Sequence, residues 1–308
     1  MQEQITTYIR AGFAGLYLVT AEEVRAEAEI RAVAEQLGYQ LFAWTITGGL
    51  INVATGSGQE MPDPVEAAAC VAELPEKSIL MLKDFHQFLG DSAQPASPLV
   101  TRTLRDQIRE ARATAKVVLV TGCTLQLPPE LAKEFTVVSF DLPGADALRG
   151  IAASIAASAS IEVEESAMRD AAEAARGLTV TEAEDIMAFA VVSTGSLDPK
   201  TIAIEKARAV GRDGILEIID PQVTAASIGG LDALKTWLGK RRLAFSPEAK
   251  AFGLPGPKGV LILGLPGTGK SLTAKAASSI LGRPILRLDA GKLFAGIVGE
   301  SEANLRRA

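Results

Sequence analysis

The stretch VLILGLPGTGKSLTAKAASSIL (residues 260–281) decides the fold expected for the last third of the chain. Its centre, GLPGTGKS (264–271), satisfies the Walker A pattern G-x-x-x-x-G-K-[ST]. The apolar run VLIL (260–263) predicts a strand, and SLTAKAASSIL (271–281) predicts a helix. This order of strand, glycine-rich loop and helix allows backbone N–H groups to surround a phosphate.

The residue types in this loop each have a physical reason to face a bound nucleotide. Gly264, Gly267 and Gly269 carry no side chain that would keep phosphate oxygens from the backbone, and glycine accepts positive φ. Lys270 supplies a positive charge for the β- and γ-phosphates, and the Ser271 hydroxyl can bind Mg²⁺. The alternative is a glycine-rich turn between strand and helix that binds no ligand.

Composition limits the classes of protein to consider. The 308 residues are 48 % hydrophobic, which predicts a folded chain of about two domains. The net charge of −6 argues against non-specific binding of nucleic acid. A single basic cluster on an expected helix is interpreted as a solvated face, with a partner or nucleic-acid contact as the alternative; it consists of Lys235, Lys240, Arg241 and Arg242.

The cysteines and the apolar segments further restrict which kinds of site and which cellular location the sequence supports. Cys70 and Cys123 form no CxxC pair, so they suggest neither a metal site nor a redox motif. The first residues lack the basic start and apolar core of a signal peptide. The least polar long run (150–161) is too short to cross a membrane. We therefore expect a cytoplasmic protein without a membrane partner.

The first 142 residues alternate between strand-like and helix-like segments. A helix is expected at 21–38, with Thr20 as its cap and Gly38 at its end, and another opens at Ser97. Apolar strands separated by helices imply a parallel sheet that is covered on both faces. The strands are expected at residues 15–20, 39–45, 78–85, 116–122 and 135–142.

The character of the sequence changes after Pro143. An Ala- and Glu-rich region to about Arg212 predicts three or four helices, and a linker at 213–222 leads into a second α/β segment. We therefore divide the chain into an α/β domain (1–142), a helical subdomain (143–212) and the linker with the start of a nucleotide-binding domain (213–308).

Three stretches together resemble the opening of an AAA+ ATPase module. They are SIGGLDALKTWLGKRR (227–242), GLPGPKGVLILGLPGTGKSLTAKAAS (253–278) and LRLDAGKLFAGIVGESEANLRR (286–307). The family most similar is that of stand-alone AAA+ ATPases first noticed as a conserved open reading frame of algal plastids and cyanobacteria. The strong match covers residues 213–308. The first half resembles that family's degenerate, nucleotide-free AAA-like domain.

This resemblance implies an α/β fold in which P-loop NTPase-type parallel sheets belong to two AAA-like modules with a helical lid subdomain between them. It implies ATP and Mg²⁺ as cofactors, Ser271 as the metal ligand, and Ile228 and Gly229 against the adenine. It also implies a set of phosphate-binding residues around the loop: Gly264, Pro266, Gly267, Thr268, Gly269, Lys270, Ser271 and Leu272.

The resemblance also implies that the complete protein forms a homo-oligomer, for which the hexamer is one arrangement. GIVG (296–299) matches the loop that lines the central pore of AAA+ hexamers. Substrate-threading members usually carry an aromatic residue where this chain has Ile297, which argues against peptide threading.

The largest departure from the family lies on the C-terminal side of the loop. After Ser271 the acidic residues are Asp289, Glu300 and Glu302, and none of them comes directly after four apolar residues. The acidic strand pair, the sensors and the arginine fingers of the family are therefore not recognised, and no catalytic residue is assigned. We expect an ATP hydrolase in complete form, but no appreciable turnover by residues 1–308 alone.

The first half departs differently. It reads VTAEEVRAE (19–27) where a phosphate loop would lie, and it places Lys83 at the first acidic position of the metal-binding pair. These charges would repel phosphate and Mg²⁺, so we expect no nucleotide there; an unrelated α/β domain is the alternative. The single histidine, His86, is interpreted as a loop or boundary residue, with a catalytic or switching role as the alternative, and one histidine does not support a Ser–His–Asp or Cys–His arrangement.

The leading functional hypothesis is an ATP-binding AAA+ protein that remodels or regulates a partner protein of unknown identity. The first alternative is a nucleotide-gated binding or scaffold module that does not turn ATP over. A small-molecule kinase built on the same loop is a third reading, and IGGLD (228–232) argues against it because kinases need no adenine-contacting segment there. The acidic composition makes nucleic acid an unfavoured partner.

Overall fold

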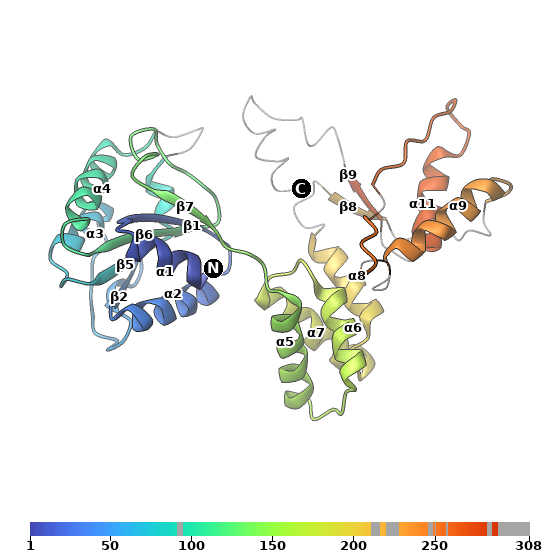
Figure 1. Ribbon diagram of the computed structural model, residues 1–308, viewed down its shortest axis with the longest axis horizontal. Helices are drawn as coiled ribbons and strands as arrows, with labels where there is room; N and C mark the ends of the chain where they lie inside the picture. The colour runs from blue at the N-terminus through green and yellow to red at the C-terminus, as the bar shows by residue number, and fades with distance from the viewer. Residues whose placement is uncertain are drawn as a thin grey trace. The chain divides into compact units, whose positions relative to one another are not determined.

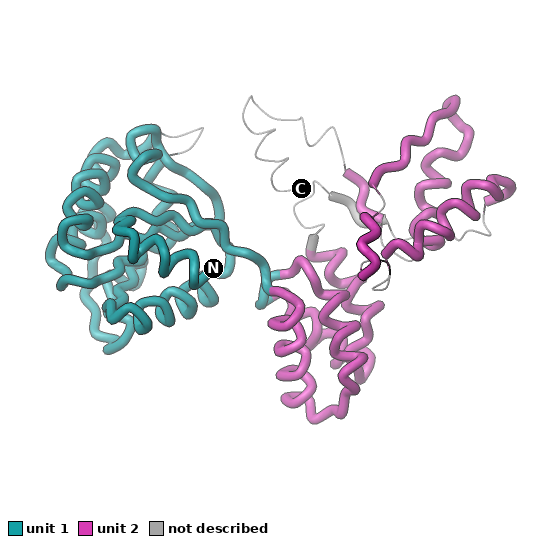
Figure 2. The backbone as a smooth tube through the Cα atoms, viewed as in Figure 1, with its two compact units in different colours: residues 1–143, 179–181 teal, residues 144–178, 182–308 magenta. Residues whose placement is uncertain are grey.

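The structure is a computed structural model of the whole chain. It divides into two compact units, residues 1–143 with 179–181 and residues 144–178 with 182–308, and each is described by itself (Figure 2). The expected three-domain division stays a prediction. The residues that the structure describes are 1–90, 95–210, 216–219, 228–245, 249, 251–256, 258–281 and 285–288.

The first unit is built on a seven-stranded sheet in the order β4-β3-β2-β5-β6-β1-β7 (Figure 1). Five of these strands, from β2 to β7 in that order, are mutually parallel, and β3 and β4 add an antiparallel edge. The strands are β1 (Gly15–Val19), β2 (Gln40–Thr45), β3 (Gly49–Asn52), β4 (Gly58–Gln59), β5 (Ser78–Lys83), β6 (Val117–Gly122) and β7 (Thr136–Ser139).

The five parallel strands lie within the five segments expected from the sequence, which confirms the predicted α/β sheet. The β3–β4 edge was not expected. Its segment is short and rich in glycine, and Gly49 pairs with Thr45 at a tight turn with a φ of 67°. A side chain at Gly49 would place its Cβ 2.1 Å from the Gln59 carbonyl oxygen, so this turn depends on glycine.

Helices cover both faces of the sheet, as the parallel strands require. Leu16 and Leu18 point into the core beneath α1 and α2, whereas Tyr17 points to the opposite face, beneath α3 and α4. The helical elements are α1 (Gln2–Arg10), α2 (Glu23–Leu37), α3 (Pro64–Ala69), α4 (Pro98–Ala111), and the 3-10 helices η1 (Cys70–Ala72) and η2 (Phe85–Phe88).

Helix boundaries follow local hydrogen bonding. Ser97 caps α4 by accepting the Val100 N–H, and Gly38 ends α2 with a φ of 69°, as expected. The prediction that Thr20 caps α2 is wrong, because the helix begins at Glu23 with Glu22 as its N-cap. The Thr20 hydroxyl instead accepts the Glu22 N–H at 2.9 Å, which forms a turn ahead of the helix.

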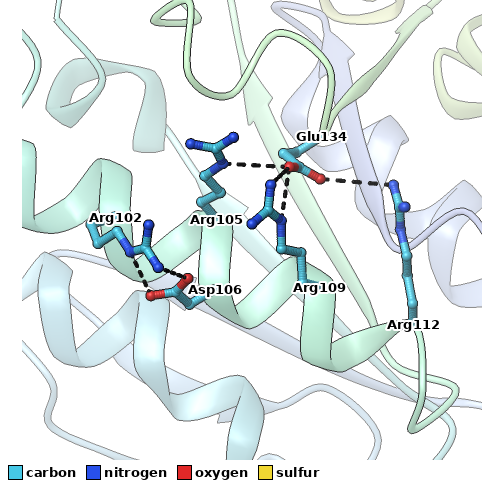
Figure 3. A network of polar contacts seen from close by, with 6 residues as sticks. All are labelled: Arg102, Arg105, Asp106, Arg109, Arg112 and Glu134. Atoms are coloured by element: carbon cyan, nitrogen blue, oxygen red, sulfur yellow. Dashed lines mark hydrogen bonds and ion pairs between the residues drawn. The ribbon is translucent and has the colours of Figure 1, made fainter.

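An arginine network holds the loop before β7 against α4 (Figure 3). Arg105 and Arg109 of α4, and Arg112 directly after it, converge on Glu134, with the closest contact, from Arg109, at 2.8 Å. Beside this loop, a side chain on Gly15 would place its Cβ 2.4 Å from the Glu134 carbonyl oxygen. The network therefore fixes a backbone that passes very close to β1.

The second unit begins with four helices whose core is largely alanine and leucine. They match the three or four helices expected between residues 145 and 212. Small side chains such as Ala171, Ala175 and Ala190 are fully buried, which allows these helices to pack closely. The helices are α5 (Ala145–Ser158), α6 (Glu165–Ala175), α7 (Val180–Thr194) and α8 (Pro199–Val210).

The rest of the second unit has a two-stranded antiparallel sheet and two described helices. The sheet pairs β8 (Leu216–Ile219) with β9 (Ile285–Leu288), so the segment expected as a linker contains a strand. The helices are α9 (Asp232–Arg242), followed by the 3-10 helix η5 (Leu243–Phe245), and α11 (Lys270–Leu281). None of the described helices is both long and apolar enough to cross a membrane.

The prediction of a strand at residues 260–263 is wrong in this structure. The segment has no strand assignment, and its side chains are exposed, with Leu261 and Leu263 each at 82 %. A strand forms only where a neighbour accepts and donates its backbone hydrogen bonds. In the described part of the second unit, β9 pairs with β8 and no strand pairs with 260–263.

Candidate functional site

The loop from Gly264 to Gly269 leads directly into α11. Gly267 and Gly269 have φ values of 81° and 82°, a region that side chains disfavour. The Thr268 hydroxyl donates to the Leu265 carbonyl oxygen at 2.8 Å and closes the turn. A Cβ on Gly264 would lie 2.9 Å from this hydroxyl. The glycines are therefore required by the backbone path itself.

The side chain of Lys270 lies over the loop. Its Nζ donates to the carbonyl oxygens of Gly264 at 2.8 Å and Leu265 at 2.6 Å. These acceptors are neutral, and a phosphate oxygen would be a stronger partner because its negative charge also attracts the ammonium group. The ammonium group is thus already placed at the loop where an anion would bind.

The first turn of α11 provides further positive potential. The N–H groups at the start of any helix lack intrahelical acceptors, and the helix dipole makes this end positive. Ser271 and Leu272 are exposed here, while Thr273 donates to the Gly269 carbonyl oxygen from both its backbone N–H, at 2.8 Å, and its hydroxyl, at 2.9 Å. The exposed N–H groups of residues 271 and 272 therefore adjoin the lysine.

The space around the loop suits a phosphate chain. A Cβ placed on Gly267 or Gly269 would meet no other atom within 4 Å, and the residues from 264 to 268 are exposed. The backbone is therefore open to a ligand, with Lys270 and the start of α11 on one side. The exposed Ser271 hydroxyl is of the type that Mg²⁺ binds, so the residues present fit Mg²⁺ with a nucleotide.

The expected adenine segment lies beside the helix that follows the loop. Ile228 and Leu231 of this segment line a small pocket together with Thr273 and Ile280 of α11, and Gly229 is exposed. Lys235 Nζ donates to the Ile228 carbonyl oxygen at 2.6 Å and fixes this segment to α9. The structure thus brings Ile228 to the phosphate-loop helix, although the adenine role itself stays a prediction.

Part of the basic cluster on α9 has local partners. Lys235 binds the Ile228 carbonyl, and the Arg241 guanidinium stacks 3.5 Å from the centre of the Trp237 ring. Both cations are therefore engaged within their own segment. Several expected residues lie outside the described part of the chain: the pore-loop segment 296–299 with Ile297, and Asp289, Glu300 and Glu302.

The matching position in the first unit, between β1 and α2, is filled by a carboxylate of the chain itself. Glu22 Oε1 accepts the backbone N–H of Val180 at 2.6 Å, and Glu22 Oε2 pairs with Arg25 at 3.1 Å. The Glu22 side chain is only 5 % exposed. Sequence reasoning missed this contact, because no pattern links residues 158 positions apart.

A second ion cluster occupies the expected metal position in the first unit. Lys83 Nζ lies 3.0 Å from Glu23 Oε1 and 2.5 Å from Glu27 Oε2. Burial would lower the pKa of Lys83, but the hydrogen bonds and charges of Glu27 and Glu23 outweigh it, so the pKa is raised. The ammonium therefore stays charged beside α2, and no Mg²⁺ is needed to neutralise these carboxylates.

Across the described residues, no group of three His, Cys, Asp or Glu side chains is arranged to hold a metal ion. The turn before α2 and the loop before α11 therefore offer groups of opposite charge. The loop at 264–271 offers cations and N–H donors to an anion. The turn at 19–23 offers carboxylates that already have partners.

Family comparisons cover most of the chain. Residues 1–140 match the N-terminal domain of SpoVK-like AAA ATPases, and residues 146–213 match the second domain of the same group. Residues 260–308 match the AAA family, the ATPases associated with various cellular activities. The matched regions therefore include both the carboxylate-filled site and the phosphate loop.

Curated relatives are similar along nearly the whole sequence. The AAA domain-containing protein ycf46 of Trieres chinensis is 31 % identical over 99 % of this chain and 61 % of its own length. The ycf46 protein of Guillardia theta is 30 % identical over 97 % of this chain and 59 % of its own length. The chain therefore spans about three fifths of the length of these relatives.

Among solved structures, the RuvB Holliday junction branch migration motor of Thermotoga maritima matches at 15 % identity with a TM-score of 0.44. The match covers 97 % of this chain and 96 % of that one.

Proposed function

The chain belongs to the AAA family of ATPases, with relatives among the ycf46 proteins, and from this premise we propose which residues bind ATP and what the binding serves. ATP with Mg²⁺ binds at the loop from Gly264 to Leu272. The complete protein hydrolyses ATP and uses the cycle to remodel or regulate a partner protein. It works as a homo-oligomer in the cytoplasm.

One observation carries the binding proposal. The Lys270 ammonium is held over the loop by two neutral carbonyl oxygens, 2.6 and 2.8 Å away, next to the open N-terminus of α11. Lys270 can exchange these neutral partners for the oxygens of the β- and γ-phosphates. The phosphate-binding residues are then Gly264, Pro266, Gly267, Thr268, Gly269, Lys270, Ser271 and Leu272.

Each group in the site has a separate role. The loop N–H groups and Lys270 bind and orient the phosphates, and the Ser271 hydroxyl holds Mg²⁺. Ile228 and Gly229 contact the adenine from the segment that packs on α11. When bound, Mg²⁺ neutralises charge on the β- and γ-phosphates. The residues of this chain contribute to the reaction by positioning the triphosphate.

The test is a titration of a fluorescent ATP analogue with Mg²⁺. Lys270→Ala should weaken binding by at least about tenfold, because a hydrogen bond to a charged group contributes about 1.5–3 kcal/mol. Lys275→Ala is the matched control, since Lys275 lies on the same helix and outside the loop. Equal affinity of Lys270→Ala and the unchanged protein would contradict the proposal.

A nucleotide-gated module without turnover is the second candidate. The described residues from 258 to 281 and from 285 to 288 include no carboxylate that could hold Mg²⁺ together with Ser271. Phosphate release by protein of residues 1–308 separates the two readings. Steady release that requires Lys270 would favour the ATPase, and binding without release would favour the module for this part of the protein.

A further inference from the structure

The carboxyl ends of β5 and β6 bring together three side chains that sequence reasoning kept apart. The two strands are parallel neighbours, with Lys83 beside Thr121. Asp84 follows β5, His86 lies in η2, and Cys123 follows β6. Open α/β sheets place their ligands and reactive groups outside the carboxyl ends of the strands. This edge of the first unit therefore holds a thiol, an imidazole and a carboxylate.

The three groups lie in the order that activates a thiol. Cys123 Sγ is 3.9 Å from His86 Nε2, and His86 Nδ1 is 4.0 Å from Asp84 Oδ1. The histidine is 6 % exposed, whereas Cys123 is exposed to solvent. A base beside the thiol and a third group that orients the base are the features of an activated nucleophile. The sequence alone supported no Cys–His arrangement, and the structure brings Cys123 next to the single histidine.

The fold holds the imidazole in this place. A Cβ on Gly122 would lie 2.3 Å from His86 Nδ1, so the ring can pack against the end of β6 only where glycine stands. Within the described structure, His86 Nδ1 is buried without a hydrogen-bond partner. Nδ1 lies on the Asp84 side of the ring, so the opposite nitrogen, Nε2, is the one that faces the thiol.

The backbone next to the thiol is also fixed. The Tyr17 hydroxyl donates to the Thr124 carbonyl oxygen at 2.7 Å and accepts the Gln126 N–H at 3.3 Å. Tyr17 is fully buried in β1, so it anchors the loop to the sheet directly after Cys123. The thiol is therefore presented from a fixed position.

The other cysteine is a natural control in the same molecule. Cys70 is buried in η1, and its thiol donates to the Ala67 carbonyl oxygen at 3.2 Å. Burial, with a further contribution from Glu73, raises the pKa of the Cys70 thiol to about 12. Cys70 stays protonated and shielded near neutral pH, so it has no reason to react.

We propose that Cys123 is a reactive thiol that His86 activates for exchange with small-molecule disulfides. The thiol proton moves to His86 Nε2, and the Cys123 thiolate attacks one sulfur of the disulfide. A bond forms between Cys123 and that sulfur as the reagent's S–S bond breaks, and the departing thiolate takes the proton from His86. The products are one mixed disulfide and one free thiol, so atoms and electrons balance.

The experiment treats the folded chain with oxidised glutathione near neutral pH and follows both cysteine peptides by mass spectrometry. Cys123 should become glutathionylated while Cys70 stays free. His86→Gln should slow the reaction of Cys123 by about tenfold or more, because a general base typically contributes at least 10²-fold when fully engaged. A thermal melt checks that the variant is folded.

Gly122→Ala is the second variant, because it displaces the imidazole while leaving both His86 and Cys123 in the chain. It should slow Cys123 to the same extent as His86→Gln. If Cys123 reacts no faster than Cys70, or if both variants react as fast as the unchanged protein, the proposal is overturned. Equal slowing by the two variants, with Cys70 unmodified throughout, supports it.

Discussion

The turn before α2 and the loop before α11 both lead directly into a helix, and they differ in the groups that lie at the start of that helix. In the first unit, the turn before α2 carries Glu22 and Glu23, whose carboxylates bind Val180 and Lys83. In the second unit, the loop before α11 carries glycines and Lys270, which binds neutral carbonyl oxygens. The turn before α2 is occupied by carboxylates that have partners within the chain, whereas the loop before α11 is exposed and open to a ligand.

This difference teaches that a fold of this type does not by itself make a nucleotide site. A helix N-terminus attracts any nearby anion, whether a phosphate or a carboxylate. Glu22 satisfies an N–H donor of the chain without an external ligand, and Lys83 balances Glu23 and Glu27 without a metal. The carboxylates of the first site thus have partners within the chain itself.

The largest effect on ATP binding is expected when the turn before α2 is separated from the loop before α11 by truncation. Protein of residues 1–212 retains the β1–α2 segment and lacks the loop at 264–271. It should fold and show no binding of ATP with Mg²⁺ in calorimetry, because the carboxylates would have to leave their partners to admit phosphate. Circular dichroism confirms folding. Micromolar ATP binding by this fragment would break the comparison.

A smaller effect is expected from removing the cation of the first site. Lys83→Met leaves Glu23 and Glu27 without their partly buried partner, and should lower the free energy of unfolding by about 1–3 kcal/mol. Lys133→Met, on an exposed lysine, is the control and should change little. Urea denaturation of both variants measures the difference, and equal stability of the two would show that the ion cluster is dispensable.

The stabilisation that Lys83 provides with Glu23 and Glu27 depends on pH in a defined direction. The pKa of Lys83 is raised in the folded protein above its ordinary value of 10.5, so its contribution is fully present below that pH. It is lost as the pH rises through the folded-state pKa. The stability gap between the unchanged protein and Lys83→Met should therefore be constant from neutral pH to about 10 and shrink above it. A gap that grows at alkaline pH would reverse the sign of this argument.

The smallest effect is expected at Glu22. Glu22→Gln keeps an oxygen that can accept the Val180 N–H and loses the charge that faces Arg25. The expected loss of stability is about 1 kcal/mol, because only the charge-dependent part of the interaction is removed. Glu35→Gln on the exposed face of α2 is the control. ATP binding by the full chain should be unchanged in both variants.

Local patterns predicted the parts of this molecule that depend on neighbours in sequence. The Gly264–Ser271 loop, the Ser97 cap and the Gly38 helix end each involve residues a few positions apart, so residue type alone indicates the geometry. The five parallel strands were also predictable, because continuous apolar runs between helices indicate a covered sheet.

Contacts between distant segments were not predictable in this way. Glu22 meets Val180 across 158 positions, and Cys123 meets His86 across 37, and neither pair forms a pattern in one sequence. The wrong strand at 260–263 has the related cause that strand formation depends on a partner segment, and in the described residues β9 pairs with β8 instead. The amino-acid composition of a segment shows its preference for strand structure, but it does not show which segment the strand pairs with.

The most direct test of the central claim is the stoichiometry of ATP binding. Calorimetric titration of ATP with Mg²⁺ into protein of residues 1–308 should saturate at a single nucleotide per chain. Lys270→Ala should weaken this binding by at least about tenfold, and Glu22→Gln should leave it intact. Saturation at two nucleotides per chain, or equal affinity after Lys270→Ala, would contradict the account that only the loop before α11 is open to a nucleotide.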